Sequence, residues 1–254
     1  MSNATPALFK DHFSASAEAY ALARPTYPQV LFDWIAAIAP ARDLAWEAGC
    51  GSGQASRDLA VRFDRVHATD PSAAQVARAP AIANVHFAVE PGERCSLGSS
   101  SVDAVCVAQA LHWFDRPAFF AECARVLRPG GVLVVWGYQD IEVPARIAAA
   151  NAELQGRIWP YWPPERADID AGYAGYAWPF EPVQGPGFDL VADWPVSRLL
   201  GYFASYSASR RYLEATGRDA VAACAADFIE AWGDPDTTQR VRWPLFVHAR
   251  RKAG

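Results

Sequence analysis

Residues 43–56 read Asp43-Leu-Ala-Trp-Glu-Ala-Gly-Cys-Gly-Ser-Gly-Gln-Ala-Ser56. The stretch begins with apolar residues of a strand and passes into alternating glycines, with Glu47 just before them. Glycine permits positive φ and leaves room for a ligand to approach the backbone. We therefore expect a strand, a tight turn and a helix whose first N–H groups face a bound molecule.

The segments around this stretch alternate between two hydrophobic patterns. Strands are predicted at 44–48, 65–70, 85–89, 102–108 and 132–136, and helices at 30–38, 54–63, 71–78 and 117–127. Such alternation implies right-handed βαβ units and a parallel sheet, with ligands at the carboxyl ends of the strands. Two more strands are predicted at 188–194 and 241–249, the last one antiparallel at or near the sheet edge, with helices near 197–206 and 219–232.

Composition excludes several classes of protein. A hydrophobic fraction of 52% in 254 residues excludes a disordered chain, and a net charge of −5 argues against a nucleic-acid partner. No apolar run is long enough to span a membrane, and the first ten residues do not form a signal peptide. The five cysteines include no CxxC pair, so no metal site is predicted and a reducing, cytoplasmic location is expected.

Three ligand chemistries compete for the glycine loop. The phosphate loop of NTPases needs a Gly-Lys dipeptide, which is absent. The dinucleotide fingerprint G-x-G-x-x-G/A places Gln54 or Ser56 at its third glycine, and Glu47 would repel a pyrophosphate. S-adenosylmethionine carries a sulfonium and an ammonium and no phosphate, so an acid there is favourable. Asp70, at the end of the second strand, can accept hydrogen bonds from ribose hydroxyls of any of these nucleotides.

The stretch Glu47-Ala-Gly-Cys-Gly-Ser-Gly53 resembles the E/D-x-G-x-G-x-G motif of class I S-adenosylmethionine-dependent methyltransferases. The N-terminal pattern His12-Phe-Ser…Tyr20…Arg24-Pro-Thr-Tyr-Pro28 is similar to the type 11, trans-aconitate methyltransferase-like branch. Gln109-Ala-Leu-His-Trp-Phe-Asp115 and Leu127-Arg-Pro-Gly-Gly131 resemble segments around the fourth and fifth strands of that branch. The resemblance implies a Rossmann-like α/β fold: a seven-stranded, mostly parallel sheet, its last strand antiparallel, with helices on both faces.

The resemblance also implies which residues contact the cofactor. The methionine half would be lined by Glu47, Gly49, Cys50, Gly51 and Gly53, and flanked by Gln109 and Ala110. Asp70 would hold the ribose and Pro71 would pack near the adenine. The segment Glu90-Pro-Gly-Glu93 stands where the branch often has Gly-Asp-Ala-Glu. Pro91 replaces the Asp that commonly meets the adenine amino group, which leaves Gly92 and Glu93 as the contacts there.

A sulfonium methyl group is already activated, so the main task of such an enzyme is to position the acceptor. A base is needed if the acceptor is a hydroxyl or a protonated amine. His112, which follows the fourth strand, is the candidate catalytic base. In the alternative interpretation, His112 hydrogen-bonds the backbone and shapes its loop.

Two regions are expected to cover the sheet. Residues 1–40 are predicted to form an N-terminal lid with helices, in which Tyr20 and Arg24 close on the cofactor or anchor the segment to the core. Residues 138–186 and 196–238 are insertions predicted to form a substrate cap, or a satellite core under a long connection. The candidate substrate contacts are Tyr27, Trp113, Trp136, Trp159 and Trp162.

We therefore expect one methyltransferase domain over residues 1–254. It would transfer a methyl group from S-adenosylmethionine to a small-molecule O, N or carboxylate acceptor, without nucleic acid, membrane or metal. The sequence leaves the oligomeric state open. Two alternatives remain at this point: an NAD(P)-dependent oxidoreductase and a non-catalytic cofactor-binding protein of the same fold.

Overall fold

The computed structural model describes residues 25–254, so Tyr20 and Arg24 lie outside the described residues. Seven strands follow one another in the sheet in the order β3-β2-β1-β4-β5-β8-β6, and an eighth, β7, also pairs with β8. The strands are β1 (Leu44–Ala48), β2 (Arg65–Asp70), β3 (Val85–Val89), β4 (Val102–Ala108), β5 (Leu127–Tyr138), β6 (Glu181–Val183), β7 (Asp189–Trp194) and β8 (Gln239–Arg251). The strand β8 runs antiparallel to β5, β6 and β7, and the other strand pairs among the described residues are parallel. The predicted fold class is confirmed.

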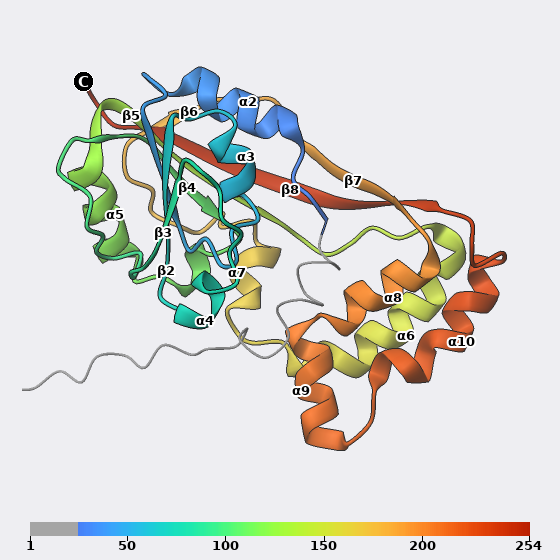
Figure 1. The fold of residues 1–254 in the computed structure, drawn as a ribbon. Coiled ribbons are helices and arrows are strands. Elements are labelled where there is room, and N and C mark those ends of the chain that lie inside the picture. The colour runs from blue at the N-terminus through green and yellow to red at the C-terminus, as the bar shows by residue number, and fades with distance from the viewer. Residues whose placement is uncertain (1–24) are drawn as a thin grey trace, which may run out of the picture.

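Helices cover both faces of the sheet (Figure 1). The helices α2 (Gln29–Ile38) and α3 (Ser56–Ala60) lie on one face, and α5 (Arg116–Val126) lies on the other. The short α4 (Ala73–Val76) follows β2, and the 3₁₀ helix η1 (Leu111–Trp113) follows β4. This arrangement places the core in two layers, one on each side of the sheet.

The central strands are apolar on both faces because each face packs against helices. Along β5, Val132, Val134 and Trp136 belong to the core on the α2 side. Their neighbours Leu133 and Val135 belong to the core on the α5 side. The alternation follows from the period of two along a strand.

The strand order reverses between β1 and β4, which are neighbours in the sheet although β2 and β3 come between them in sequence. The glycine loop begins where β1 ends, and the Gln109 segment begins where β4 ends. Both strands run parallel, so both loops lie at the same edge of the sheet. An open α/β sheet binds its ligands at such a position.

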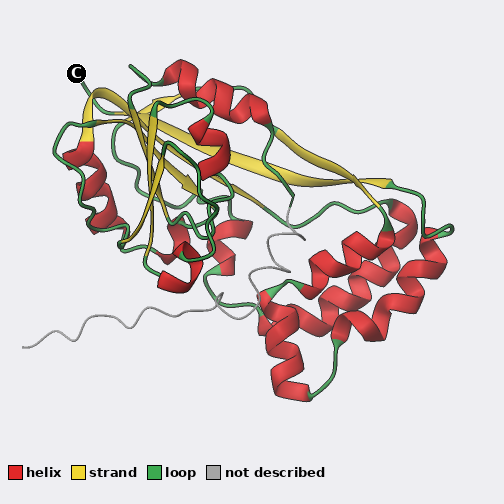
Figure 2. Ribbon diagram, viewed as in Figure 1, coloured by secondary structure: helices red, strands yellow, loops and turns green. Residues whose placement is uncertain are grey.

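A second group of helices lies beside the sheet, at the far end of β7 and β8 (Figures 1 and 2). We call α6 (Ala148–Ile158), α8 (Val196–Ala204), α9 (Ser207–Thr216) and α10 (Ala220–Trp232) the cap helices; they pack against one another. The connection between β5 and β6 also carries η2 (Ala145–Ile147), η3 (Trp159–Tyr161) and α7 (Arg166–Asp170). Three aromatic rings join α8 to β7 and β8: those of Tyr202, Trp194 and Trp243, with ring centroids 4.9–5.6 Å apart.

The strands predicted at 188–194 and 241–249 are present as β7 and β8. The strand β8 lies between β5 and β6, one position inside the edge that β6 forms. The sequence analysis missed β6, whose three residues include Pro182. Proline lacks an N–H donor, so a strand that contains it is confined to an edge and gives a weak sequence signal. It also missed α6 and α9, which bury few residues each.

Candidate active site

The glycine loop is fastened to the end of β2 by backbone and carboxylate hydrogen bonds. The N–H groups of Gly49 and Cys50 donate to the Thr69 carbonyl oxygen at 2.8 and 2.9 Å. The N–H of Gly51 donates to Asp70 Oδ2 at 2.9 Å, and Asp70 Oδ1 accepts from the N–H of Ser72 at 2.8 Å. A carboxylate oxygen has two lone pairs and can accept more than one hydrogen bond. Asp70 therefore sets the shape of the loop beside which a ribose is predicted to bind.

The three glycines have different environments, although all have positive φ, from 55° to 84°. A Cβ on Gly49 would lie 2.7 Å from the Cβ of Ala110, and a Cβ on Gly53 would lie 2.8 Å from the Phe87 ring. A Cβ on Gly51 would meet no atom within 4 Å. Gly49 and Gly53 thus allow close internal packing, whereas the space over Gly51 is open to a ligand.

Glu47 is buried at the end of β1, where the hydroxyl of Ser56 donates to its Oε2 atom. Burial raises the pKa of Glu47 to about 8, although the hydrogen bond from Ser56 opposes the change and Asp70 adds to it. Burial likewise raises the pKa of the Cys50 thiol. A neighbouring cation would favour the ionised carboxylate. Direct contact between Glu47 and the cofactor stays a prediction.

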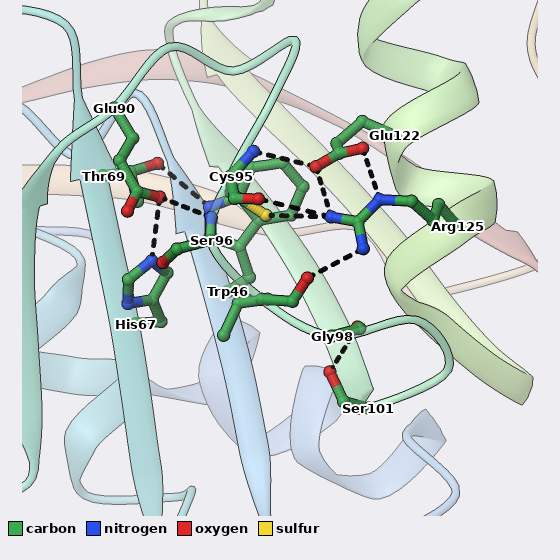
Figure 3. Close-up of polar contacts among 11 residues, drawn as sticks. Trp46, His67, Thr69, Glu90, Cys95, Ser96, Gly98, Ser101, Glu122 and Arg125 are labelled. Carbon is green, nitrogen blue, oxygen red and sulfur yellow. Dashed lines mark hydrogen bonds and ion pairs between the residues drawn. The ribbon is translucent and has the colours of Figure 1, made fainter.

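The segment after β3, where the adenine is predicted to bind, is held by two sets of polar contacts (Figure 3). The carboxylate of Glu90 accepts from the N–H of Ser96 at 3.0 Å and contacts His67 Nε2 at 3.1 Å. Further along, Glu122 Oε1 accepts from the N–H of Cys95 at 2.8 Å and from Arg125 Nη2 at 2.6 Å. These contacts attach the segment to β2 and α5.

Gly92 and Glu93 also hold the two sides of this region together. A Cβ on Gly92 would lie 3.0 Å from the Phe114 ring, and Glu93 Oε1 accepts from the N–H of Asp115 at 2.7 Å. Pro71, at the other side of the predicted adenine position, is half-buried. The helix after it, α4, is capped by the side chain of Ser72, which accepts from the N–H of Gln75.

Gln109 closes the gap between the ends of β4 and β5. Its side-chain Oε1 accepts from the N–H of Tyr138 at 2.8 Å, and its Nε2 donates to the Tyr138 carbonyl at 3.1 Å. Its φ of 53° turns the chain out of the sheet. Ala110 then lies buried against Gly49. The predicted pair Gln109 and Ala110 therefore shapes the boundary between the glycine loop and the substrate side.

A cavity lies between the carboxyl ends of β4 and β5 and the cap helices, with a volume of about 90 Å³. The sheet side and the cap side contribute different residues. The sheet side contributes Gln109, His112, Trp113, Tyr138, Gln139 and Asp140. The cap side contributes Trp162, Pro163, Arg166, Ile169, Tyr202, Tyr206 and Ser207.

The predicted substrate residues divide into three groups. Trp113 and Trp162 line the cavity. Tyr27 and Trp136 are buried in the core beneath, with ring centroids 5.8 Å apart. Trp159 is 59% exposed and does not line the cavity. The structure thus brings Trp113 and Trp162 together at the cavity, and substrate contact by the other three residues stays a prediction.

His112 lines the cavity from η1. Its Nδ1 atom lies 2.9 Å from the hydroxyl oxygen of Tyr173. Burial lowers the pKa of His112 to about 4, while Asp168 opposes this change and Arg166 adds to it. His112 is therefore neutral at physiological pH. This hydrogen bond joins His112 to a side chain, whereas the structural interpretation of His112 from the sequence expected a bond to the backbone.

Several cavity residues were not identified from the sequence. Arg166 stacks over Trp162 at 4.4 Å and pairs with Asp140 and Asp170, both at 2.7 Å. Tyr206 lies 5.0 Å from the ring of Trp162. These residues come from α7 and the start of α9, far from the motifs. Only the aromatic richness of the region pointed to them.

Three further features of residues 25–254 concern metal binding, membrane crossing and disulfide bonds. No group of three or more His, Cys, Asp or Glu side chains in this range could hold a metal ion. No helix in the same range combines the length and the apolarity that crossing a membrane requires. All five cysteines lie in this range and are unpaired.

Comparison with known proteins places these features in context. Residues 46–135 match a family described as "Methyltransferase domain". A proposed methyltransferase of Dictyostelium discoideum is 30% identical over 256 residues, covering 98% of this chain and 97% of that protein. Trans-aconitate 2-methyltransferase of Deinococcus radiodurans is 38% identical over 130 residues, covering 46% of this chain and 48% of that protein. The solved structure of a proposed type II methyltransferase from Anaeromyxobacter dehalogenans has a TM-score of 0.86 and 40% identity, covering 91% of this chain and 99% of that one.

Proposed function

This chain belongs to the class I S-adenosylmethionine-dependent methyltransferases, and we propose that its acceptor is a small molecule held in the cavity between the sheet and the cap helices. Its cofactor is S-adenosylmethionine, so the oxidoreductase alternative is set aside. The observation that carries the proposal is the position of the cavity. It adjoins Gln109 and His112, at the edge of the sheet where the glycine loop also lies.

The residues present fit the cofactor. The open space over Gly51 lets a ligand reach the backbone, and the carboxylate of Asp70 lies next to it. The acids Glu47 and Asp70 suit a ligand that carries positive charge. When bound, S-adenosylmethionine supplies a methyl group on a sulfonium that is already activated for transfer. We propose that Asp70, Gly51 and Gln109 hold it, with Gly92 and Glu93 beside its adenine.

In this proposal the chain itself positions the acceptor and excludes water. Trp113 and Trp162 supply flat apolar walls, and Arg166 with its partner Asp140 adds a polar edge. The cap helices cover the open side of the cavity, as the insertions predicted from the sequence would. Fixing two reactants in line can supply a large part of a rate enhancement. The walls suit a small planar molecule, which reacts through O, N or a carboxylate.

The proposal is tested by incubating the protein with S-adenosylmethionine and a panel of small carboxylic acids, phenols and amines, with S-adenosylhomocysteine formation as the readout. We expect turnover with at least one class. Ser207 lines the cavity, so Ser207→Trp is expected to fill it and to abolish turnover while S-adenosylhomocysteine still binds in calorimetric titration.

The matched control is Ala215→Trp, which adds the same side chain at an exposed position of the same helix, α9. We expect this variant to keep its activity. Turnover by Ser207→Trp at the rate of Ala215→Trp would contradict an acceptor site in the cavity. Binding of S-adenosylhomocysteine without turnover on any class would favour the non-catalytic alternative.

A further inference from the structure

The pairing of His112 with Tyr173 joins two parts of the chain that are 61 residues apart. Tyr173 is fully buried, and it sits at a φ of 58° just after α7. Its ring stacks on that of Tyr176 at 4.9 Å and meets Phe246 edge-on at 5.0 Å. These contacts leave the hydroxyl directed at one side-chain partner among the described residues, the Nδ1 atom of His112.

A hydrogen bond between a hydroxyl and a neutral imidazole can run in either direction. If Tyr173 accepts from Nδ1–H, its own hydroxyl proton is left buried without an acceptor, which is unfavourable. If Tyr173 donates to Nδ1, its buried hydroxyl proton has an acceptor. The donor that is then left over is Nε2–H of His112, a residue that lines the cavity. This second arrangement places the imidazole proton on Nε2.

We propose that Tyr173 donates its hydroxyl proton to Nδ1 of His112, so that neutral His112 presents Nε2–H to the cavity as a hydrogen-bond donor for the acceptor molecule. Nε2 has no partner among residues 25–254, and His112 lines the cavity. Tyr173 is a positioning residue, because it acts only through His112. The role is opposite to that of a general base, which needs a lone pair on Nε2.

The local electrostatics agree with this direction. Burial raises the pKa of Tyr173 well above its usual range, and Tyr176 adds to the effect, so the hydroxyl keeps its proton. Burial lowers the pKa of His112, so the ring stays neutral and has one nitrogen free to accept from Tyr173. The charged groups that face this pair are Asp168 and Arg166.

The inference rests on the proposed function and narrows its acceptor. Trp162 also lines the cavity, and its indole Nε1–H is buried without a hydrogen-bond partner among the described residues. The N–H donor on His112 favours an acceptor oxygen that is already ionised, since hydrogen bonds to a charged group are about twice as strong as neutral ones. A carboxylate acceptor fits this donor, because it is ionised at neutral pH and needs no base. An ammonium group does not fit an N–H donor.

The direction of the hydrogen bond is tested by ¹⁵N NMR of the full chain labelled at histidine, in which the His112 signals are those missing from His112→Gln. We expect the Nε2–H tautomer in the native protein, and a shift toward a mixture in Tyr173→Phe. The Nδ1–H tautomer in the native protein would overturn the proposal. This measurement needs neither cofactor nor acceptor, so its outcome is separate from that of the turnover assay.

The acceptor class is tested by calorimetry on protein saturated with S-adenosylhomocysteine, with benzoate and benzylamine as probes. We expect benzoate to bind at least tenfold more tightly than benzylamine. His112→Gln keeps an N–H near the position of Nε2 but cannot act as a base, so its affinity for benzoate should stay within about threefold, whereas His112→Ala should lose tenfold. Absence of benzoate binding, tighter binding of benzylamine, or equal losses in the two variants would overturn the donor role.

Discussion

At the level of single residues, Gly51 and Gly53 separate ligand binding from folding. A Cβ on Gly53 would collide with Phe87, whereas one on Gly51 would enter open space. We expect Gly53→Ala to lower the free energy of unfolding by about 2–5 kcal/mol, from its positive φ and from overpacking. Gly51→Ala should cost only about 1–2 kcal/mol from its positive φ.

Relative to its small effect on stability, Gly51→Ala should have a large effect on cofactor binding. The methyl group of Gly51→Ala enters the space predicted for the cofactor, so the affinity for S-adenosylhomocysteine should fall by about tenfold or more, which is 1.4 kcal/mol. Urea unfolding and calorimetric titration of both variants check the prediction. A Gly51→Ala protein with native affinity would show that the cofactor does not approach the loop there.

The raised pKa of Glu47 predicts a stability that depends on pH. The folded-state value of about 8 lies above the ordinary 4.5, so the folded protein holds a proton that the unfolded chain releases between these values. The contribution is therefore fully present below pH 4.5 and is lost as pH rises toward 8. Because Glu47→Gln does not titrate, the melting temperature of the native protein should fall relative to that variant between pH 5 and 8.

The measurement is the melting temperature of the cofactor-free native protein and of Glu47→Gln at several pH values. A loss of 1 kcal/mol corresponds to roughly 2–4 °C in a protein of this size. The difference in melting temperature between the two proteins should narrow when S-adenosylmethionine is added, because a bound cation favours the ionised carboxylate. If the melting temperatures of the two cofactor-free proteins change with pH in parallel, the raised pKa of Glu47 is contradicted.

At the level of elements, the segment between β3 and β4 depends on the ion pair of α5. Glu122 is buried and binds both Arg125 and the N–H of Cys95 (Figure 3). The hydrogen bonds from Arg125 lower the pKa of Glu122 to about 2 against the opposing effect of burial. The stabilisation is present above pH 4.5 and is lost as pH falls toward 2.

Glu122→Gln is therefore expected to lower the free energy of unfolding at pH 7 by about 1.5–3 kcal/mol. The control is Glu153→Gln, which removes the carboxylate from the exposed pair with Arg157 on α6 and should leave the free energy of unfolding nearly unchanged. Urea unfolding at pH 7 and pH 3 measures both, and the deficit of Glu122→Gln should shrink at the lower pH. Equal costs for the two variants would show that the segment is held by other contacts.

At the level of the whole molecule, the cap helices depend on a buried aromatic junction with β8. Trp243 is fully buried, and its Nε1 donates to the hydroxyl oxygen of Tyr202 on α8 at 2.8 Å. Trp243→Ala should destabilise the protein by about 3–5 kcal/mol, and hydrogen exchange should accelerate in α8 and α10 before it does in β1 and β4. Trp159→Ala, at a residue 59% exposed, is the matched control and should leave exchange unchanged. Uniform acceleration over the chain would mean that cap and sheet unfold together.

The sequence predicted the elements whose patterns are local. The strands β1, β2, β3 and β4 have the predicted bounds. The pattern is strongest in β1 and β4, because parallel strands buried on both faces appear as short runs of mostly apolar residues. The weak patterns of β6 and α9 did not identify them, since a three-residue edge strand and a mostly exposed helix carry little periodicity. The insertion of β8 beside β5 is likewise a long-range pairing that no local pattern determines.

By itself the sequence determined the class of fold and the family, because the alternation of strands and helices and the glycine motif are local patterns. It also predicted the place of the cofactor, beside the glycines, Glu47 and Asp70, which stays a prediction. Only the tertiary structure decided which aromatic residues line the cavity and what His112 contacts. Trp162 and Tyr173 reach the site through the folding of connections far from the motifs, and a side chain's orientation there depends on packing between distant elements. The glycine loop itself shows the same division: its three glycines have the same pattern in sequence, and only packing shows that Gly51 alone faces open space.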